Sequence, residues 1–301
     1  MGSGYDKAVH PPSRRNLLQA TALLASPLQS ATERHPTYCL NTATLQGYKL
    51  PIAQLIDITA RAGFTAIEPW LNQLTDVSTP EIRKRIQDAG LKVESAIAFP
   101  QWIVDDDAKR SAALEQMKRE MDIVAQIGGT RIAAPPAGAN NAPAIPLERI
   151  GERYRAVLEI GDRVGVTPEL EFWGGSRNLR SLPEAVHAAM LADHAKACVL
   201  ADVFHLYKGG SPLHSIGMLS AQTLQVIHIN DYPATPPRES IGDRDRVFPG
   251  DGVAPLRQIL GDLYRINPNV VLSLELFNPN YWTGDPLETA RRGLAKMKAL
   301  R

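Results

Sequence analysis

Four ionisable residues occur in succession along the second half of the chain, each within a short apolar segment. They are Glu171, Asp202, His228 and Glu275. A lone carboxylate or imidazole buried among apolar side chains costs free energy unless it gains a partner or a metal ion. Two glutamates, one aspartate and one histidine form an oxygen-rich donor set with a single nitrogen, which suits Mn²⁺, Mg²⁺ or Co²⁺ better than a structural Zn²⁺. We therefore predict a divalent-metal site, with Mn²⁺ favoured and Zn²⁺ kept as an alternative.

A metal site of this kind can acidify a C–H bond beside a carbonyl. The cation polarises the carbonyl oxygen or an adjacent hydroxyl oxygen and stabilises the enediolate as negative charge develops. A carboxylate on each side of the substrate carbon can then remove and return a proton. The residue types thus indicate proton-transfer chemistry on a small carbohydrate-type or polyol-type substrate.

The segments that must position these residues alternate between short β-type runs and longer runs of helical period. Strands are predicted at residues 38–44, 66–70, 92–99, 131–135, 167–173, 197–204, 225–231 and 270–277. Helices are predicted at residues 50–62, 79–89, 107–127, 147–164, 182–191, 254–263 and 286–300. The connection at 208–221 is predicted to hold a loop and a short helix, because it contains several glycines and a proline. This alternation is typical of βα units around a parallel sheet.

Eight consecutive βα units predict a single (β/α)8 TIM barrel. In such a barrel the carboxyl ends of the strands build the active site. The four ionisable residues fall near the ends of the last four predicted strands, so the barrel would bring them together. An open doubly wound sheet is the alternative, but no G-x-G-x-x-G motif follows the first strand and no P-loop occurs.

The first 35 residues differ from the rest of the chain. Arg14 and Arg15 precede a short apolar stretch at residues 20–28, an order that resembles a twin-arginine export signal. A disordered basic leader is the alternative. We predict such a leader at 1–35 and a TIM-barrel catalytic domain at 36–301. An export signal would place the protein in the periplasm, and its absence would leave it in the cytoplasm.

The charge balance and the cysteine content exclude several classes of protein. Lysine and arginine total 33 and aspartate and glutamate 32, so a net charge of +1 gives no field that recruits nucleic acid or an anionic membrane. The apolar stretch of the leader is shorter than the ~20 residues that span a bilayer, so no stable membrane association is expected. Cys39 and Cys198 are too few for a disulfide framework and are predicted to pack in the core. The sequence leaves the formation of a homo-oligomer open.

From about residue 38 to its end, the chain resembles the xylose isomerase-like TIM-barrel superfamily of sugar isomerases, epimerases and related AP endonucleases. In that family a Glu ends strand five, Asp-x-x-His ends strand six, His-x-x-Asp ends strand seven and Glu ends strand eight. The matching residues here are Glu171, Asp202 with His205, His228 with Asp231, and Glu275. Residues 246–252, Arg-Val-Phe-Pro-Gly-Asp-Gly, resemble the Arg and Gly-rich turn that the family carries after strand seven.

The resemblance implies that Glu171 and Glu275 are both metal ligands and the acid–base pair of an isomerase or epimerase. If elimination follows proton abstraction, the same pair makes a dehydratase or lyase on a keto-sugar, an inosose or a 3-dehydroshikimate-like substrate. The metal motif does not distinguish these outcomes. A nuclease and a barrel that only binds a ligand are further alternatives, which the near-neutral charge and the intact ligand set disfavour, respectively.

Four further residues are predicted to contact the substrate. His205 and Arg246 can donate hydrogen bonds to negative charge that develops near the metal. The resemblance adds Glu68 at the end of the second strand, and Trp173 offers a flat aromatic face to a sugar ring. No paired-arginine cluster or glycine-rich anion loop accompanies the metal motif, so recognition of phosphate is not predicted.

Overall fold

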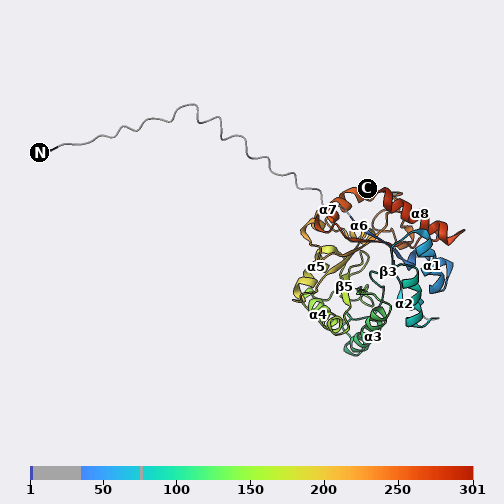
Figure 1. Ribbon diagram of the computed structural model, residues 1–301. Helices are drawn as coiled ribbons and strands as arrows, with labels where there is room; N and C mark the ends of the chain where they lie inside the picture. Colours follow the sequence, from blue (N-terminus) through green and yellow to red (C-terminus); the bar gives the residue numbers. More distant parts are fainter. Residues whose placement is uncertain (3–34, 75–76, 301) are drawn as a thin grey trace. The chain divides into compact units, whose positions relative to one another are not determined.

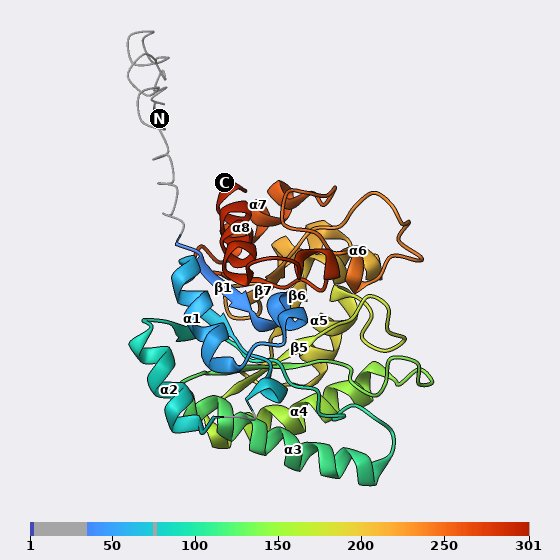
Figure 2. The ribbon, with the colours of Figure 1, turned by 90° about the vertical axis from the view of Figure 1, so that its right-hand side faces the viewer.

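The computed structural model describes residues 1–2, 35–74 and 77–300. The predicted leader falls almost entirely outside these residues, and its role in export stays a prediction. Residues 34–301 form one unit, in which the described strands lie at the centre and the helices surround them (Figure 1). Figure 2 shows the same unit from the side. Within the described residues no helix combines the length and the apolar character that crossing a bilayer requires.

Eight parallel strands form the sheet in the order β3-β2-β1-β8-β7-β6-β5-β4. Their bounds are β1 Thr37–Asn41, β2 Ala66–Glu68, β3 Lys92–Val93, β4 Arg131–Ala134, β5 Thr167–Glu171, β6 Val199–Asp202, β7 Val226–Ile229 and β8 Val271–Leu274. The seam between β3 and β4 is bridged by a hydrogen bond from Ala133 N to Ala96 O at 2.8 Å. The curled sheet and its helices confirm the predicted single (β/α)8 barrel.

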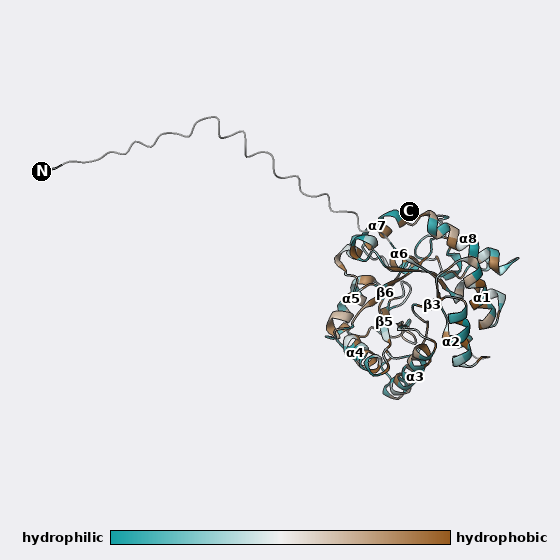
Figure 3. Cartoon of the chain, in the orientation of Figure 1, coloured by the Kyte–Doolittle hydropathy of each residue, from teal (hydrophilic) through white to brown (hydrophobic). Residues whose placement is uncertain are grey.

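Eight α-helices in the described residues follow the strands. They are α1 Ile52–Ala62, α2 Thr79–Asp88, α3 Asp107–Gln126, α4 Leu147–Val164, α5 Leu182–Leu191, α6 Val203–Gly209, α7 Leu256–Ile266 and α8 Pro286–Ala299. In Figure 3 these helices carry both hydrophilic and hydrophobic stretches, as expected for helices that bury one face against a sheet. The strands are buried along most of their length, and both cysteines lie in the core.

Several predicted strands extend beyond the observed ones, and two of them have a clear structural reason. The strand predicted at 92–99 pairs with β2 only at Lys92 and Val93, and beyond these an isolated bridge joins Ile97 to Trp70. The strand predicted at 197–204 ends at Asp202, where α6 begins directly. The Asp202 carboxylate accepts a hydrogen bond from His205 N at 2.9 Å and so caps α6, which is why the chain turns into a helix two residues early.

Candidate active site

A cavity of about 730 Å³ opens at the carboxyl ends of the strands. Glu171, Glu275, His205, Arg246 and Trp173 line it, so five of the predicted site residues meet there. Asp202 and His228 lie just beneath and are fully buried. Glu171 is the last residue of β5, Asp202 is the last of β6, and Glu275 directly follows β8. The location is the one at which parallel barrels hold their catalytic groups.

The donor atoms of Asp202, His228 and Glu275 lie within 4.8 Å of one another. Register explains part of this, because Asp202 of β6 pairs with His228 of β7. His228 Nδ1 is 3.2 Å from Glu275 Oε2 and 3.7 Å from Asp202 Oδ2. Among the described residues this buried nitrogen has no hydrogen-bond partner. An unpartnered imidazole nitrogen that faces two carboxylates fits a bound divalent cation.

Glu68 occupies a different place from the one predicted. It is fully buried and is not among the residues that line the cavity. Its Oε2 lies 3.1 Å from His228 Nε2 and accepts hydrogen bonds from Ser273 Oγ at 2.6 Å and Asn41 Nδ2 at 2.9 Å. Burial alone would raise the pKa of Glu68, but His228 and these hydrogen bonds lower it overall. This position favours a role in orienting His228 over contact with the substrate.

Arg246 extends from the loop between β7 and α7 into the cluster formed by Asp202, His228 and Glu275. Its Nη1 donates to Asp202 Oδ2 at 2.7 Å and to Glu275 Oε2 at 3.0 Å, and only 1% of the side chain is exposed. The guanidinium carbon lies 4.8 Å from the ring centroid of Phe204 and 4.9 Å from that of Phe277. Burial opposes its charge, but the neighbouring carboxylates outweigh burial and raise the pKa of Arg246. The arginine is therefore a fixed cation at the cavity wall.

His205 has one more hydrogen-bond donor around it than it can satisfy. Its Nδ1 accepts from Gly174 N at 3.3 Å, and its Nε2 lies 3.3 Å from Arg246 Nη2, which is also a donor. Burial and the charge of Arg246 lower the pKa of His205, so its ring is neutral at pH 7 and can accept at only one nitrogen. One of the two donors, Gly174 N or Arg246 Nη2, is therefore left without an acceptor on His205. A substrate oxygen placed between His205 and Arg246 would supply that acceptor.

The two glutamates that line the cavity have different surroundings. Glu275 accepts hydrogen bonds from Asn41 Nδ2 and Arg246 Nη1, both at 3.0 Å. Burial, together with the charges of Glu275 and Asp202, raises the pKa of Glu171 to about 8 although His228 opposes this. In the metal-free protein Glu171 therefore holds a proton at neutral pH.

Asp231 organises the loop that carries Arg246. Its carboxylate accepts hydrogen bonds from the backbone N–H groups of Tyr232, Gly250, Gly252 and Ala254, at 2.8 to 3.0 Å. A Cβ on Gly252 would come within 2.4 Å of Asp231 Oδ1, so glycine is needed for this close approach. The Pro-Gly-Asp-Gly turn is thereby held against β7, and Arg246 at its start is fixed.

Two amide side chains that donate hydrogen bonds to the acidic residues of this site were not predicted from the sequence. Asn41, the last residue of β1, donates to both Glu68 and Glu275, and its Oδ1 accepts from Trp70 Nε1 at 2.9 Å. Asn230, which follows β7, donates to Asp202 Oδ2 at 3.1 Å. The pattern that marked the ionisable residues was a polar side chain at the end of an apolar strand. Asn41 and Asn230 show the same pattern, although they carry no charge.

The chain belongs to the xylose isomerase-like TIM barrel family, whose model matches residues 56–300. Over 137 residues it is 30% identical to the inosose isomerase of Bacillus licheniformis, an alignment that covers 44% of this chain and 48% of the relative. The chain thus matches about half of that relative's length.

Solved structures share the fold, and two of them illustrate the likeness. The IolI protein with a bound zinc atom superimposes with a TM-score of 0.79 at 22% sequence identity, covering 88% of this chain and 97% of that one. L-ribulose 3-epimerase superimposes with a TM-score of 0.71 at 18% identity, covering 89% and 94%. At these identities the likeness shows the barrel fold alone.

Proposed function

We propose that the protein is a divalent-metal-dependent sugar isomerase or epimerase that moves a proton beside a carbonyl. One observation carries the proposal: Glu171 and Glu275 both line the cavity, on strand ends separated by β6 and β7, above the cluster of Asp202 and His228. Two carboxyl groups that line one cavity from different strand ends can act as acid and base on one substrate carbon.

Each residue of the site has a separate role in the proposed proton transfer. Glu275, which accepts hydrogen bonds from Arg246 and Asn41, removes the proton from the substrate carbon. Arg246 and His205 direct donors at the oxygen on which negative charge develops. Glu171, which lines the same cavity from the end of β5, returns a proton from the opposite side, which inverts the carbon in an epimerase. Return to the neighbouring carbon gives an isomer instead.

Asp202, His228 and Glu275 would hold the metal, and we propose Glu171 as the fourth ligand. A divalent cation in this place supplies a Lewis acid that polarises the substrate carbonyl. We propose Mn²⁺, because three of the four ligands are carboxylates. The zinc atom in the related IolI structure makes Zn²⁺ the competing metal for the same site.

The substrate class is proposed from the similarity and from the cavity. The relatives named inosose isomerase indicate a cyclic polyol ketone or a keto-sugar as the reacting part. Aromatic side chains line one wall, with the ring centroids of Trp70 and Phe99 4.9 Å apart and those of Trp70 and Phe277 5.8 Å apart. Such a wall can contact the apolar face of a sugar ring.

The test is proton exchange. Mn²⁺-loaded and Zn²⁺-loaded protein is incubated in D₂O with inososes, ketoses and 3-keto-glycosides, and NMR follows deuterium entry at the carbon beside the carbonyl. We expect exchange with at least one member of the panel and its loss in Glu171→Gln and in Glu275→Gln. Glu81→Gln, on the exposed face of α2, is the matched control. Exchange that survives in both site variants contradicts the proposal.

The same samples separate the alternative reaction. A dehydratase releases water, so mass spectrometry would detect a product lighter than the substrate by one water molecule. An isomerase or epimerase gives a product of unchanged composition that carries deuterium. Loss of water without accumulation of an isomer would replace the proposed reaction with dehydration at the same glutamate pair.

A further inference from the structure

The catalytic cavity continues into a second hollow of about 460 Å³. The two share five lining residues: Asn140, Asn141, Gly175, Ser176 and Lys208. The second hollow lies where the loop after β4, the loop after β5, the end of α6 and the long loop after β7 meet. The second hollow therefore adjoins the cavity that Glu171 and Glu275 line.

The second hollow is basic. Arg177, Arg180 and Arg238 line it, and Glu239 is its single acidic lining residue. We call these three arginines the distal arginine cluster. In the part of the chain that the structure describes, no carboxylate oxygen lies within 4.0 Å of the guanidinium of Arg177 or Arg180. The nearby Glu184 accepts from the backbone N of Arg180 at 2.6 Å instead.

The loop that carries Arg238 is fixed in place rather than free. Lys208 Nζ donates to the carbonyl oxygens of Arg238 and Glu239, both at 2.9 Å, and to that of Ile241 at 2.8 Å. The ammonium group is thus saturated by backbone acceptors. Among the described residues, the acidic partner of Arg238 is Glu239, with 4.0 Å between the Nε of Arg238 and the carboxylate. The positive charge of the hollow therefore has few internal partners.

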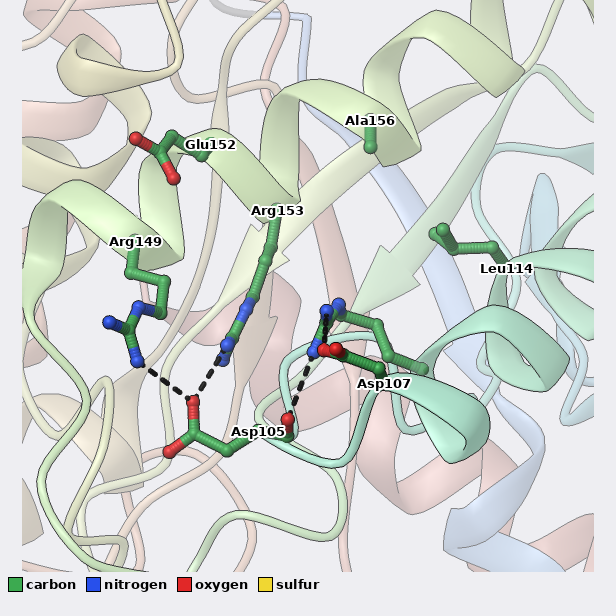
Figure 4. A pocket seen from close by; sticks show the side chains of 8 residues that line it. Asp105, Asp107, Leu114, Arg149, Glu152, Arg153 and Ala156 are labelled. Atoms are coloured by element: carbon green, nitrogen blue, oxygen red, sulfur yellow. Dashed lines mark hydrogen bonds and ion pairs between the residues drawn. The ribbon is translucent and has the colours of Figure 1, made fainter.

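A second group of arginines shows the contrasting case. Arg149 and Arg153 both point at the carboxylate of Asp105 in Figure 4, with shortest distances of 3.4 Å and 2.7 Å. Arg110 pairs with Asp107 in the same pocket. Each of these arginines has an acidic partner within the chain, so this pocket fixes the loop before α3 against α4. Clustered arginines alone do not indicate a ligand, and the distal arginine cluster differs because it lacks such partners.

We propose that the distal arginine cluster binds an anionic group, a carboxylate, sulfate or phosphate, that the substrate carries at a distance from its reacting carbonyl. The inference rests on the proposed function for the reacting end of the substrate. Guanidinium groups match such oxyanions through paired hydrogen bonds. A cavity of about 730 Å³ lies within the range of about 300–1,000 Å³ that holds ligands larger than one sugar ring. The substrate class is accordingly a keto-sugar joined to a second, anionic residue or aglycone.

Matched probes test the charge preference. Phenyl β-D-glucopyranoside and its 4-carboxyphenyl and 4-sulfophenyl analogues differ only in the distal group, and calorimetry on metal-loaded protein gives their affinities. We expect a charged analogue to bind about fivefold more tightly than the neutral one at low salt, since partly exposed ion pairs contribute up to about that factor. The two analogues distinguish a carboxylate from a sulfonate, which presents the same three terminal oxygens as a sulfate. The preference should vanish in Arg177→Gln/Arg180→Gln and persist in Arg149→Gln.

Chemical labelling tests the cluster without a sugar. Phenylglyoxal modifies free arginines, and peptide mass spectrometry gives the rate at each site. We expect inorganic sulfate or phosphate at millimolar concentration to protect Arg177 and Arg180, but not Arg149, which Asp105 already pairs. Equal affinity of all probes together with no protection would overturn the proposal. Protection without a probe preference would leave an anion site and overturn its role in an extended substrate.

These outcomes are separate from those of the proposed function. Deuterium exchange of a neutral inosose depends on Glu171 and Glu275, whereas the affinities and labelling rates depend on the distal arginine cluster. If exchange fails while anion binding succeeds, the reaction is wrong and the subsite stands. If exchange succeeds while anion binding fails, the substrate is a neutral molecule confined to the catalytic cavity.

Discussion

Arg246 Nη1 lies 2.7 Å from Asp202 Oδ2, and both side chains are almost completely withdrawn from water. The same nitrogen donates to Glu275, so one guanidinium balances the negative charges of two members of the predicted metal site, Asp202 and Glu275. Arg246 thus stabilises the site in the metal-free protein and presents donors to the substrate. A bound metal ion would take over the first role, which is to balance the carboxylates, but not the second, which is to donate hydrogen bonds to the substrate.

Arg246→Gln is expected to lower the free energy of unfolding of the metal-free protein by about 3–5 kcal/mol, the cost of breaking a buried ion pair. Urea unfolding in the presence of a chelator measures this. Adding Mn²⁺ or Zn²⁺ should restore much of the loss, because a cation again compensates Asp202 and Glu275. Arg244→Gln, an exposed change in the same loop, is the control. A loss of stability that metal does not reduce would argue against a metal at this cluster.

Glu171 gives the stability of the metal-free protein a defined pH dependence. Its pKa is about 8 in the folded protein and about 4.3 in an unfolded chain. Between these values the folded state binds more protons than the unfolded state, so Glu171 lowers stability as pH rises from about 4.3 to about 8. In Glu171→Gln this loss is absent, and the variant should gain several kcal/mol relative to the wild type across this window, then level off.

Denaturant titrations of both proteins with a chelator at several pH values measure that difference. The comparison isolates Glu171, since the buried Glu169 shifts in the same direction in both proteins. A difference that is flat between pH 5 and 8 would show that Glu171 is not a neutral acid in the folded protein.

The convergence of Asp202, His228 and Glu275 was predictable from the sequence because it depends on a simple regularity. Ionisable residues at the ends of apolar strands converge in a parallel barrel, and Asp202, His228 and Glu275 obey this rule. The barrel was predictable for the same reason, since the alternation of strand and helix periods is a local property. The family model, which matches residues 56–300, confirms the resemblance to the xylose isomerase-like TIM-barrel superfamily that the sequence motifs indicated.

Depth within the barrel could not be predicted. Glu68 ends a strand of only three residues, and the sequence does not show whether it faces the cavity or lies beneath His228. Asn41 was missed because an amide carries no charge to mark it, although it joins Glu68 to Glu275. The distal arginine cluster was missed because Arg177 and Arg238 lie on loops far apart in the sequence. These features depend on tertiary packing.

Glu68→Gln is expected to weaken metal binding by about 10–100-fold, the usual effect of removing a carboxylate that orients a histidine ligand. The Glu68 carboxylate lies 3.1 Å from His228 Nε2, and an amide stabilises the required tautomer less strongly. Competition with a fluorescent chelator measures the affinity. Glu81→Gln serves again as the control. Unchanged affinity would mean that His228 does not bind the metal through its other nitrogen.

Lys208→Met tests whether the long loop after β7 is held by one ammonium group. Removal deletes the hydrogen bonds from one charged donor to the carbonyl oxygens of Arg238, Glu239 and Ile241, which together contribute about 1.5–3 kcal/mol locally. Loop opening should then become at least roughly tenfold more frequent, and hydrogen exchange mass spectrometry should show faster exchange at residues 238–246. Lys196→Met, which removes an ion pair with the half-exposed Asp162, should leave this loop unchanged. Equal exchange in wild type and Lys208→Met would show that the turn held by Asp231 is sufficient to position Arg246.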